Sequence, residues 1–174
     1  MKAKTNNNIC GGLYTKKVLE TFKNTHNYGK IKNADGIGKV GNLICGDVMH
    51  LYIKVVKNKK DEEFIKDIKF ETFGCVAAIS TSSIITDLVK GKTIKEALKI
   101  TKDNVIESLG GLPKIKYHCS VLAADALVEA IYDYYKRNPS TNSGQGISAD
   151  LQKKHEIIKK SKDIIDKRYE KWAK

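Results

Sequence analysis

The feature that most constrains the fold is a change in hydrophobic period near residue 75. From residue 48 to 56, apolar and polar side chains alternate, which is typical of a strand with one buried face. A polar turn follows, and residues 64–73 are expected to form another strand. Between residues 77 and 88 the apolar side chains recur at helical spacing instead, and Gly91 ends that segment. Strands that precede helices favour an α+β domain whose helices cover one face of a small antiparallel sheet.

A further strand is expected earlier in the chain. Glycines punctuate residues 35–41, which excludes a regular helix and indicates a turn that feeds a strand. The sequence therefore predicts a three-stranded antiparallel sheet. The inner faces of its two later strands should carry Met49, Leu51, Ile53, Val55, Phe64, Ile68 and Phe70.

Several helices surround this sheet in the prediction. Residues 15–22 form a short one, and Thr93 caps another, with Glu96 in the position of a capping box. Asp103 is expected to cap the next helix, and the last core helix covers residues 120–137. The inner face of that long helix should carry Val121, Ala124, Val128, Ile131 and Tyr135.

Composition divides the chain into a flexible leader (1–13), one domain (14–138), a flexible linker (139–148) and a lysine-rich amphipathic helix (149–174). The last segment repeats apolar residues every seven positions, at Leu151, Ile158, Ile165 and Trp172. We expect this helix to dock on its own domain or on a neighbouring subunit. A partner protein or a membrane surface is the alternative.

Charge and targeting signals narrow the function classes. The formal net charge is +12, but only two of the 32 basic residues are arginine, the side chain that binds phosphate and guanine in a bidentate fork, so we expect no nucleic-acid partner. No signal peptide and no apolar run of about 20 residues is present, so we expect a cytoplasmic protein without a membrane partner. In that compartment the four cysteines should be thiols or metal ligands.

Three of the cysteines are expected to meet at one end of the sheet. Cys45 lies in the turn between the first and second strands, and Cys75 follows the third strand, which ends on the same side in an antiparallel meander. Cys75 and Cys119 also begin helices, whose positive ends should stabilise thiolates and lower the thiol pKa. Gly46 and Gly74 would let the backbone approach a bound cluster.

A fourth ligand is available beside these thiolates. Asp47 and His118 are both adjacent to them in sequence, and three thiolates with one oxygen or imidazole ligand suit either tetrahedral zinc or a 2Fe-2S cluster. The residues alone leave the choice open.

Three segments, residues 35–48, 70–93 and 115–127, together resemble the IscU/NifU amino-terminal family of iron-sulfur cluster assembly scaffolds. The resemblance extends from about residue 14 to 137 and preserves the order of the motifs. It implies that Cys45, Cys75 and Cys119 are the cluster thiolates and that Asp47 and His118 are interchangeable candidates for the fourth ligand. It also implies a role for Lys116, which would pair with Asp47 or with a thiolate when no cluster is bound.

The same resemblance implies a function. The chain would be a scaffold and not an enzyme: it would receive sulfur from a cysteine desulfurase, assemble a 2Fe-2S cluster, or a 4Fe-4S cluster across a homodimer, and transfer it to apo-proteins. An oxygen or imidazole ligand would give the cluster a weak side from which it can leave, since permanent electron-transfer sites are closed by four thiolates. Zinc is the other metal expected in the site after purification.

The chain departs from the family pattern in two places. Residues 24–27 read Asn-Thr-His-Asn where the family has Asn-Pro-Arg-Asn, and residues 112–116 read Leu-Pro-Lys-Ile-Lys where Hsp70-type chaperones recognise Leu-Pro-Pro-Val-Lys. The loss of one proline from this motif argues against recognition by a specialised Hsp70-type chaperone, which is kept only as a possible partner. The remaining cysteine and histidines, which are Cys10, His26, His50 and His155, are expected to lie outside the site, the histidines at the surface.

Two other functions use the same residues. A zinc-dependent sulfur carrier of the same fold would need the same three cysteines. That branch of the family typically has an insertion between its second and third cysteines and lacks the histidine that precedes the third cysteine, whereas this chain has His118 there. A cysteine-histidine hydrolase would need His118 to activate a thiolate, yet adjacent residues at a helix start seldom direct their side chains together. The scaffold is the hypothesis that uses all the candidate ligands.

Overall fold

The computed structural model describes residues 13–42, 45–138 and 147–172, and side chains up to residue 163. Most of the predicted leader and linker therefore lies outside the described residues. The elements in chain order are α1 (Lys16–Lys23), β1 (Gly36–Asn42), β2 (Asp47–Lys57), β3 (Glu63–Phe73), α2 (Val76–Val89), α3 (Ile94–Ala97), α4 (Lys102–Ser108), the 3-10 helix η1 (Lys114–Lys116), α5 (Tyr117–Arg137) and α6 (Ala149–Trp172).

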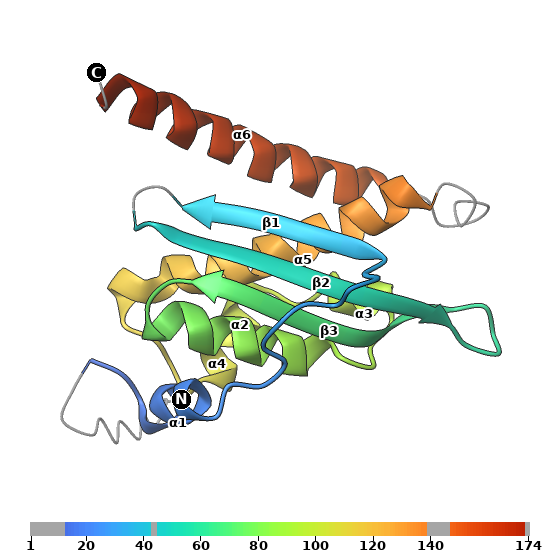
Figure 1. Cartoon of the computed structure of the whole chain (residues 1–174), viewed down its shortest axis with the longest axis horizontal. Coiled ribbons are helices and arrows are strands. Elements are labelled where there is room, and N and C mark those ends of the chain that lie inside the picture. The colour runs from blue at the N-terminus through green and yellow to red at the C-terminus, as the bar shows by residue number, and fades with distance from the viewer. Residues whose placement is uncertain (1–12, 43–44, 139–146, 173–174) are drawn as a thin grey trace, which may run out of the picture.

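The three strands form one antiparallel sheet in the order β1-β2-β3, and the helices α2 and α5 lie behind it (Figure 1). The core lies between these layers: Leu51 and Phe70 from the sheet and Ile85 and Leu127 from the helices are almost completely buried. Burial of such side chains supplies most of the stability of a domain of this kind. The predicted α+β class and three-stranded sheet are confirmed.

The glycine-rich segment is itself the first strand, not the turn that the sequence predicted. β1 pairs with β2 along its whole length, and α5 lies directly on it. A side chain at Gly36 would collide with the carbonyl oxygen of Ala130, and one at Gly38 with that of Ala126. The glycines are therefore required by the close approach of the α5 backbone, which no local pattern reveals.

The third strand also differs from the expected face assignment. Ile68 and Phe70 are buried as predicted, but Ile65 is fully buried while Phe64 is half-buried. The register between β2 and β3 shifts at Lys54 and Val55, where a bulge adds one residue to β3. One extra residue reverses the alternation beyond it.

Two helix predictions need correction. Thr101, not Asp103, caps α4, and it forms a capping box with Asn104. In α5 the inner face is rotated from the expected one, so that Val121 is exposed and Ala124 and Val128 are only partly buried, although Ile131 and Tyr135 are buried as predicted. The capping box of Thr93 and Glu96 is present.

The last helix, α6, lies beside α5 and the outer edge of β1 (Figure 1). Leu151 is fully buried and Ile158 packs against the core, whereas Ile165 and Trp172 fall outside the described side chains. None of the described helices combines the length and the apolar character that crossing a membrane would require.

Candidate metal centre

The antiparallel topology brings the predicted ligands to one end of the sheet. Cys45 lies just before Gly46, whose φ of 73° makes the left-handed turn into β2, and Asp47 is the first residue of that strand. Cys75 is the N-cap of α2, directly after β3. His118 and Cys119 lie in the first turn of α5, opposite Asp47.

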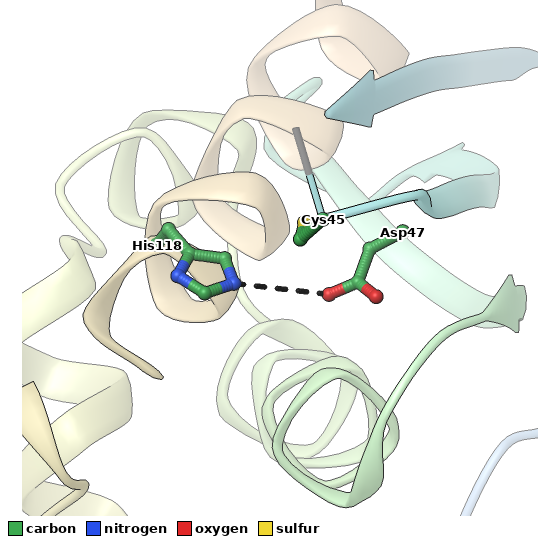
Figure 2. A group of neighbouring side chains, drawn as sticks. All are labelled: Cys45, Asp47 and His118. Carbon is green, nitrogen blue, oxygen red and sulfur yellow. Dashed lines mark ion pairs between the residues drawn. The ribbon is translucent and has the colours of Figure 1, made fainter. Parts of the chain in front are cut away.

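The side chains converge in two overlapping groups that share Asp47. Ligand atoms of Cys45, Asp47 and His118 all lie within 4.8 Å of one another, and so do those of Asp47, Cys75 and Cys119. Figure 2 shows the first group, in which the imidazole of His118 faces the carboxylate. The Sγ atoms of Cys75 and Cys119 are 3.9 Å apart, and Sγ of Cys119 is 3.6 Å from Oδ2 of Asp47. The five residues thus surround one small volume.

The position of Asp47 is fixed by the packing around it. Its side chain is buried, which is unusual for a carboxylate and calls for partners. A Cβ atom on Gly74 would lie 2.9 Å from Oδ1 of Asp47 and 2.8 Å from Cβ of Ala78. Glycine at position 74 therefore leaves the space that the carboxylate occupies.

His118 carries an unused ligand atom. Its Nε2 atom is buried and has no hydrogen-bond partner, the only such side-chain nitrogen or oxygen in the described part of the chain. The nearest carboxylate oxygen, Oδ2 of Asp47, is 4.0 Å away. Since an unpaired buried polar atom costs free energy, this imidazole is suited to bind an added electrophile such as a metal ion.

The thiol pKa values differ from the prediction. Burial, together with the neighbouring Cys75, raises the pKa of the Cys119 thiol, and partial burial raises that of Cys45. The positive helix end at Cys119 is therefore outweighed by desolvation, which disfavours the charged thiolate. A bound metal would reverse this balance, because the cation stabilises the thiolates directly.

Two further side chains lie beside Cys75. Negative charge at Cys75 raises the pKa of Lys116, and burial, followed by that same charge, raises the pKa of Tyr14. Both side chains therefore lie beside Cys75, and the pairing of Lys116 stays a prediction. Tyr14 was not predicted, because its contact with Cys75 depends on how α1 packs against α2 and leaves no local signal.

The other singled-out residues lie away from the centre. Cys10 is outside the described residues. His26 is exposed and pairs with Asp87, as a surface residue would, and His50 is half-buried on β2. His155 is not solvent-facing as predicted, because it stacks on Tyr132 and hydrogen-bonds to Glu129.

Comparison with known proteins places this geometry in a family. The family model described as the NifU-like N terminal domain matches residues 13–141, which is most of the chain. This chain belongs to the NifU-like N-terminal domain family. The resemblance read from the motifs is thereby confirmed.

Relatives of this NifU-like domain are similar over most of their length. The chain is 55% identical over 143 residues to the iron-sulfur cluster assembly scaffold protein IscU 1 of Archaeoglobus fulgidus, covering 81% of this chain and 90% of that protein. It is 40% identical over 151 residues to the IscU scaffold of Aquifex aeolicus, covering 87% and 94%. The crystal structure of the N-terminal part of a NifU-like protein from Brucella abortus shares the fold, with a TM-score of 0.59 at 20% identity over 71% of this chain and 95% of that one.

Proposed function

We propose that this protein is a scaffold, not an enzyme, on which an iron-sulfur cluster is assembled and from which it is passed to other proteins. The observation that carries the proposal is the convergence of Cys45, Asp47, Cys75, His118 and Cys119 from three elements on one volume. Relatives that align over most of the chain are named as scaffolds for cluster assembly. The cluster is cargo here, so the site has to bind it and also release it.

The donor set supports a 2Fe-2S cargo held by three thiolates and one weaker ligand. Cys45, Cys75 and Cys119 supply the sulfur ligands, and Asp47 is our candidate for the labile fourth position, with His118 as the alternative. Asp47 belongs to both groups of ligand atoms, so its carboxylate could bind a metal ion together with either group. Its oxygen exchanges more readily on iron than a thiolate does, which would give the cluster a place to open.

Sulfur delivery follows from thiolate chemistry. A scaffold thiolate attacks the terminal sulfur of a persulfide on a cysteine desulfurase, the sulfur-sulfur bond of the donor breaks, and the donor cysteine leaves as its thiolate. A reductant then supplies an electron pair that breaks the sulfur-sulfur bond of the scaffold persulfide, which restores the scaffold thiolate and frees the transferred sulfur as sulfide for the cluster. Lys116, next to Cys75, would offset negative charge at that thiolate between cycles.

Several finer aspects stay predictions. These are a cytoplasmic location, a 4Fe-4S product formed across a homodimer, and an Hsp70-type partner that reads the segment Leu112–Lys116. In the structure that segment is partly the 3-10 helix η1, and Ile115 is strongly exposed, so a partner could reach it.

Anaerobic reconstitution tests the proposal. With ferrous iron, L-cysteine and a cysteine desulfurase, the chain should develop the absorption and Mössbauer spectra of a 2Fe-2S cluster, and Cys45→Ser, Cys75→Ser and Cys119→Ser should each lose most of it. Cys10→Ser is the matched control and should bind as the unchanged chain does. Equal cluster content in all four variants would contradict the assignment.

The same experiment separates the zinc-dependent sulfur carrier. Three thiolates with a carboxylate or imidazole also suit tetrahedral zinc. A chain that stays colourless, and that accepts persulfide sulfur only when zinc is bound, would favour the carrier.

A further inference from the structure

Two thiols of the site lie in contact with each other. The Sγ atoms of Cys75 and Cys119 are 3.9 Å apart, and this is the only thiol pair in hydrogen-bond contact among the described residues. A disulfide bond is about 2.05 Å long, so each Sγ atom would have to move by about 1 Å, which small side-chain rotations supply. Cys75 is the N-cap of α2 but makes no capping hydrogen bond, so its own helix does not hold the thiol in place. The two side chains can therefore be joined by local movement.

The core keeps this pair together. Thr81 of α2 is completely buried, and its hydroxyl lies 3.3 Å from the carbonyl oxygen of Cys119 in α5 and 3.1 Å from that of Ala78 in its own helix. The two helices that carry the thiols thus meet directly behind them. Because protein interiors are densely packed, the thiols cannot separate without disturbing this contact. Each thiol is held at a high effective concentration for reaction with the other.

The thiols differ in their access to solvent. Cys75 is half-buried, whereas Cys119 is 1% exposed, so a small oxidant reaches Cys75 first. Cys45 is exposed as well, but its Sγ atom belongs to the other ligand group, with Asp47 and His118. An oxidised Cys75 would therefore meet the thiol of Cys119 before any other.

We propose that the metal-free chain carries a redox-active dithiol, Cys75 and Cys119, which a peroxide converts reversibly to an intramolecular disulfide. The Cys75 thiolate attacks hydrogen peroxide, the oxygen-oxygen bond breaks, and a sulfenic acid and hydroxide are formed. Sγ of Cys119 then attacks the sulfenic sulfur, the sulfur-sulfur bond forms and a second hydroxide leaves. Two thiols thus lose two electrons, and their protons and one peroxide give two molecules of water. A dithiol reductant reverses the reaction by thiol-disulfide exchange.

The disulfide would switch the site off without destroying it. Thiolates are the metal ligands, and a disulfide removes two of the three that the site offers. It also spares these sulfur atoms further oxidation to sulfinic and sulfonic acids, which is mostly irreversible. The block on cluster binding rests on the proposed scaffold function, whereas the formation of the disulfide does not.

Mapping the disulfide tests the first step. The chain is freed of metal with a chelator, treated with hydrogen peroxide, alkylated with N-ethylmaleimide in denaturant, digested and analysed by mass spectrometry. The unaltered chain should yield peptides that link Cys75 to Cys119 within one molecule, with Cys45 and Cys10 outside the link. Cys45→Ser is the matched control and should form the same link at the same rate. Cys75→Ser should slow oxidation of Cys119 by about tenfold or more, because the buried thiol loses its accessible partner.

Three outcomes of this mapping would overturn the dithiol. They are a link that includes Cys45, a link formed only between two molecules, and oxidation of Cys75 to a sulfinic acid without any link. None of them depends on a variant, so a folding defect in Cys75→Ser would leave the result clear.

Cobalt(II) tests the second step without a sulfur donor, because absorption from thiolate to cobalt reports the thiolate ligands directly. The disulfide form, freed of peroxide, should show this absorption severalfold weaker than the reduced chain, and dithiothreitol should restore it. An unchanged cobalt spectrum would overturn the block on metal binding. Failure of the scaffold function would show separately, as a reduced chain that assembles no cluster although the disulfide forms as described.

Discussion

Replacing Gly74 by alanine tests whether Asp47 is held in place by packing. The new Cβ would lie 2.9 Å from Oδ1 of Asp47, 3.1 Å from its Cγ and 2.8 Å from Cβ of Ala78. Relaxed carbon contacts lie at about 3.5–4.0 Å, so the neighbours have to retreat by roughly 0.5–1 Å. Ala78 is fixed on the backbone of α2 and cannot rotate away, whereas the carboxylate can. The strain therefore falls mainly on Asp47.

The displacement has two expected consequences. Overpacking of this kind costs about 1–3 kcal/mol, so the free energy of unfolding in urea should fall by that amount. Moving Asp47 away from Cys119 and His118 should also remove the labile oxygen ligand, and cluster transfer to an apo-acceptor should slow by about tenfold, as for other changes that reorient a ligand. Transfer is followed by the visible circular dichroism of the acceptor.

Controls separate the two effects. Gly41→Ala adds a methyl group near the same turn, but its Cβ would lie 3.7 Å from the carbonyl oxygen of Asp47, an ordinary contact, so stability and transfer should stay unchanged. In an Asp47→Ala background, Gly74→Ala should have no further effect on transfer. If Gly74→Ala lowered stability but transferred its cluster at the normal rate, the positioning of Asp47 by Gly74 would be refuted.

Three other substitutions follow from the same structure. Asp47→Ala alone should leave the fourth position to His118 and slow transfer by about tenfold while the bound cluster persists longer; equal lifetimes in stopped-flow transfer would contradict a labile Asp47. Burial, and then the neighbouring Glu129, raises the pKa of Asp125 from 3.8 to about 6, so charging this carboxylate destabilises the folded state as the pH rises from about 4 to 6. Asp125→Asn should therefore raise the free energy of unfolding at pH 7 by about 1–3 kcal/mol and remove that loss of stability, which urea titrations at pH 4 and pH 7 would show. Gly38→Ala should lower stability by about 3 kcal/mol, because its Cβ would meet the α5 backbone at Ala126; thermal melts beside Gly41→Ala would check it.

Much of this fold could be predicted because each side of the sheet and of the long helices faces a different environment. The alternation in β2 shows that difference directly in the sequence, whereas α2 is rich in apolar and small residues because most of its positions are buried. β1 shows no such alternation, because its glycines are required where the α5 backbone approaches the strand closely. The bulge in β3 likewise depends on pairing with β2, so Phe64 was assigned to the wrong face.

The site shows a similar division. Cys45, Cys75 and Cys119 were placed together by topology alone, because strand ends and a helix start must meet at one end of an antiparallel meander. Two other contacts could not be predicted. Tyr14 approaches Cys75 through the packing of α1, and His155 approaches α5 through that of α6, so neither contact leaves a spacing that sequence could show.

The arrangement of exposure explains how one site could both hold and release cargo. Cys119 and Asp47 are buried, so water has little access to these two ligands and would compete poorly with them for the metal. Cys45 is exposed in the turn before β2, where an acceptor thiolate could replace it without entering the core. Ligand exchange that begins at Cys45 would free one edge of the cluster while the buried ligands, Asp47 and Cys119, still hold the other. Release would then proceed one ligand at a time, which requires the gradient from exposed to buried ligands that this fold provides.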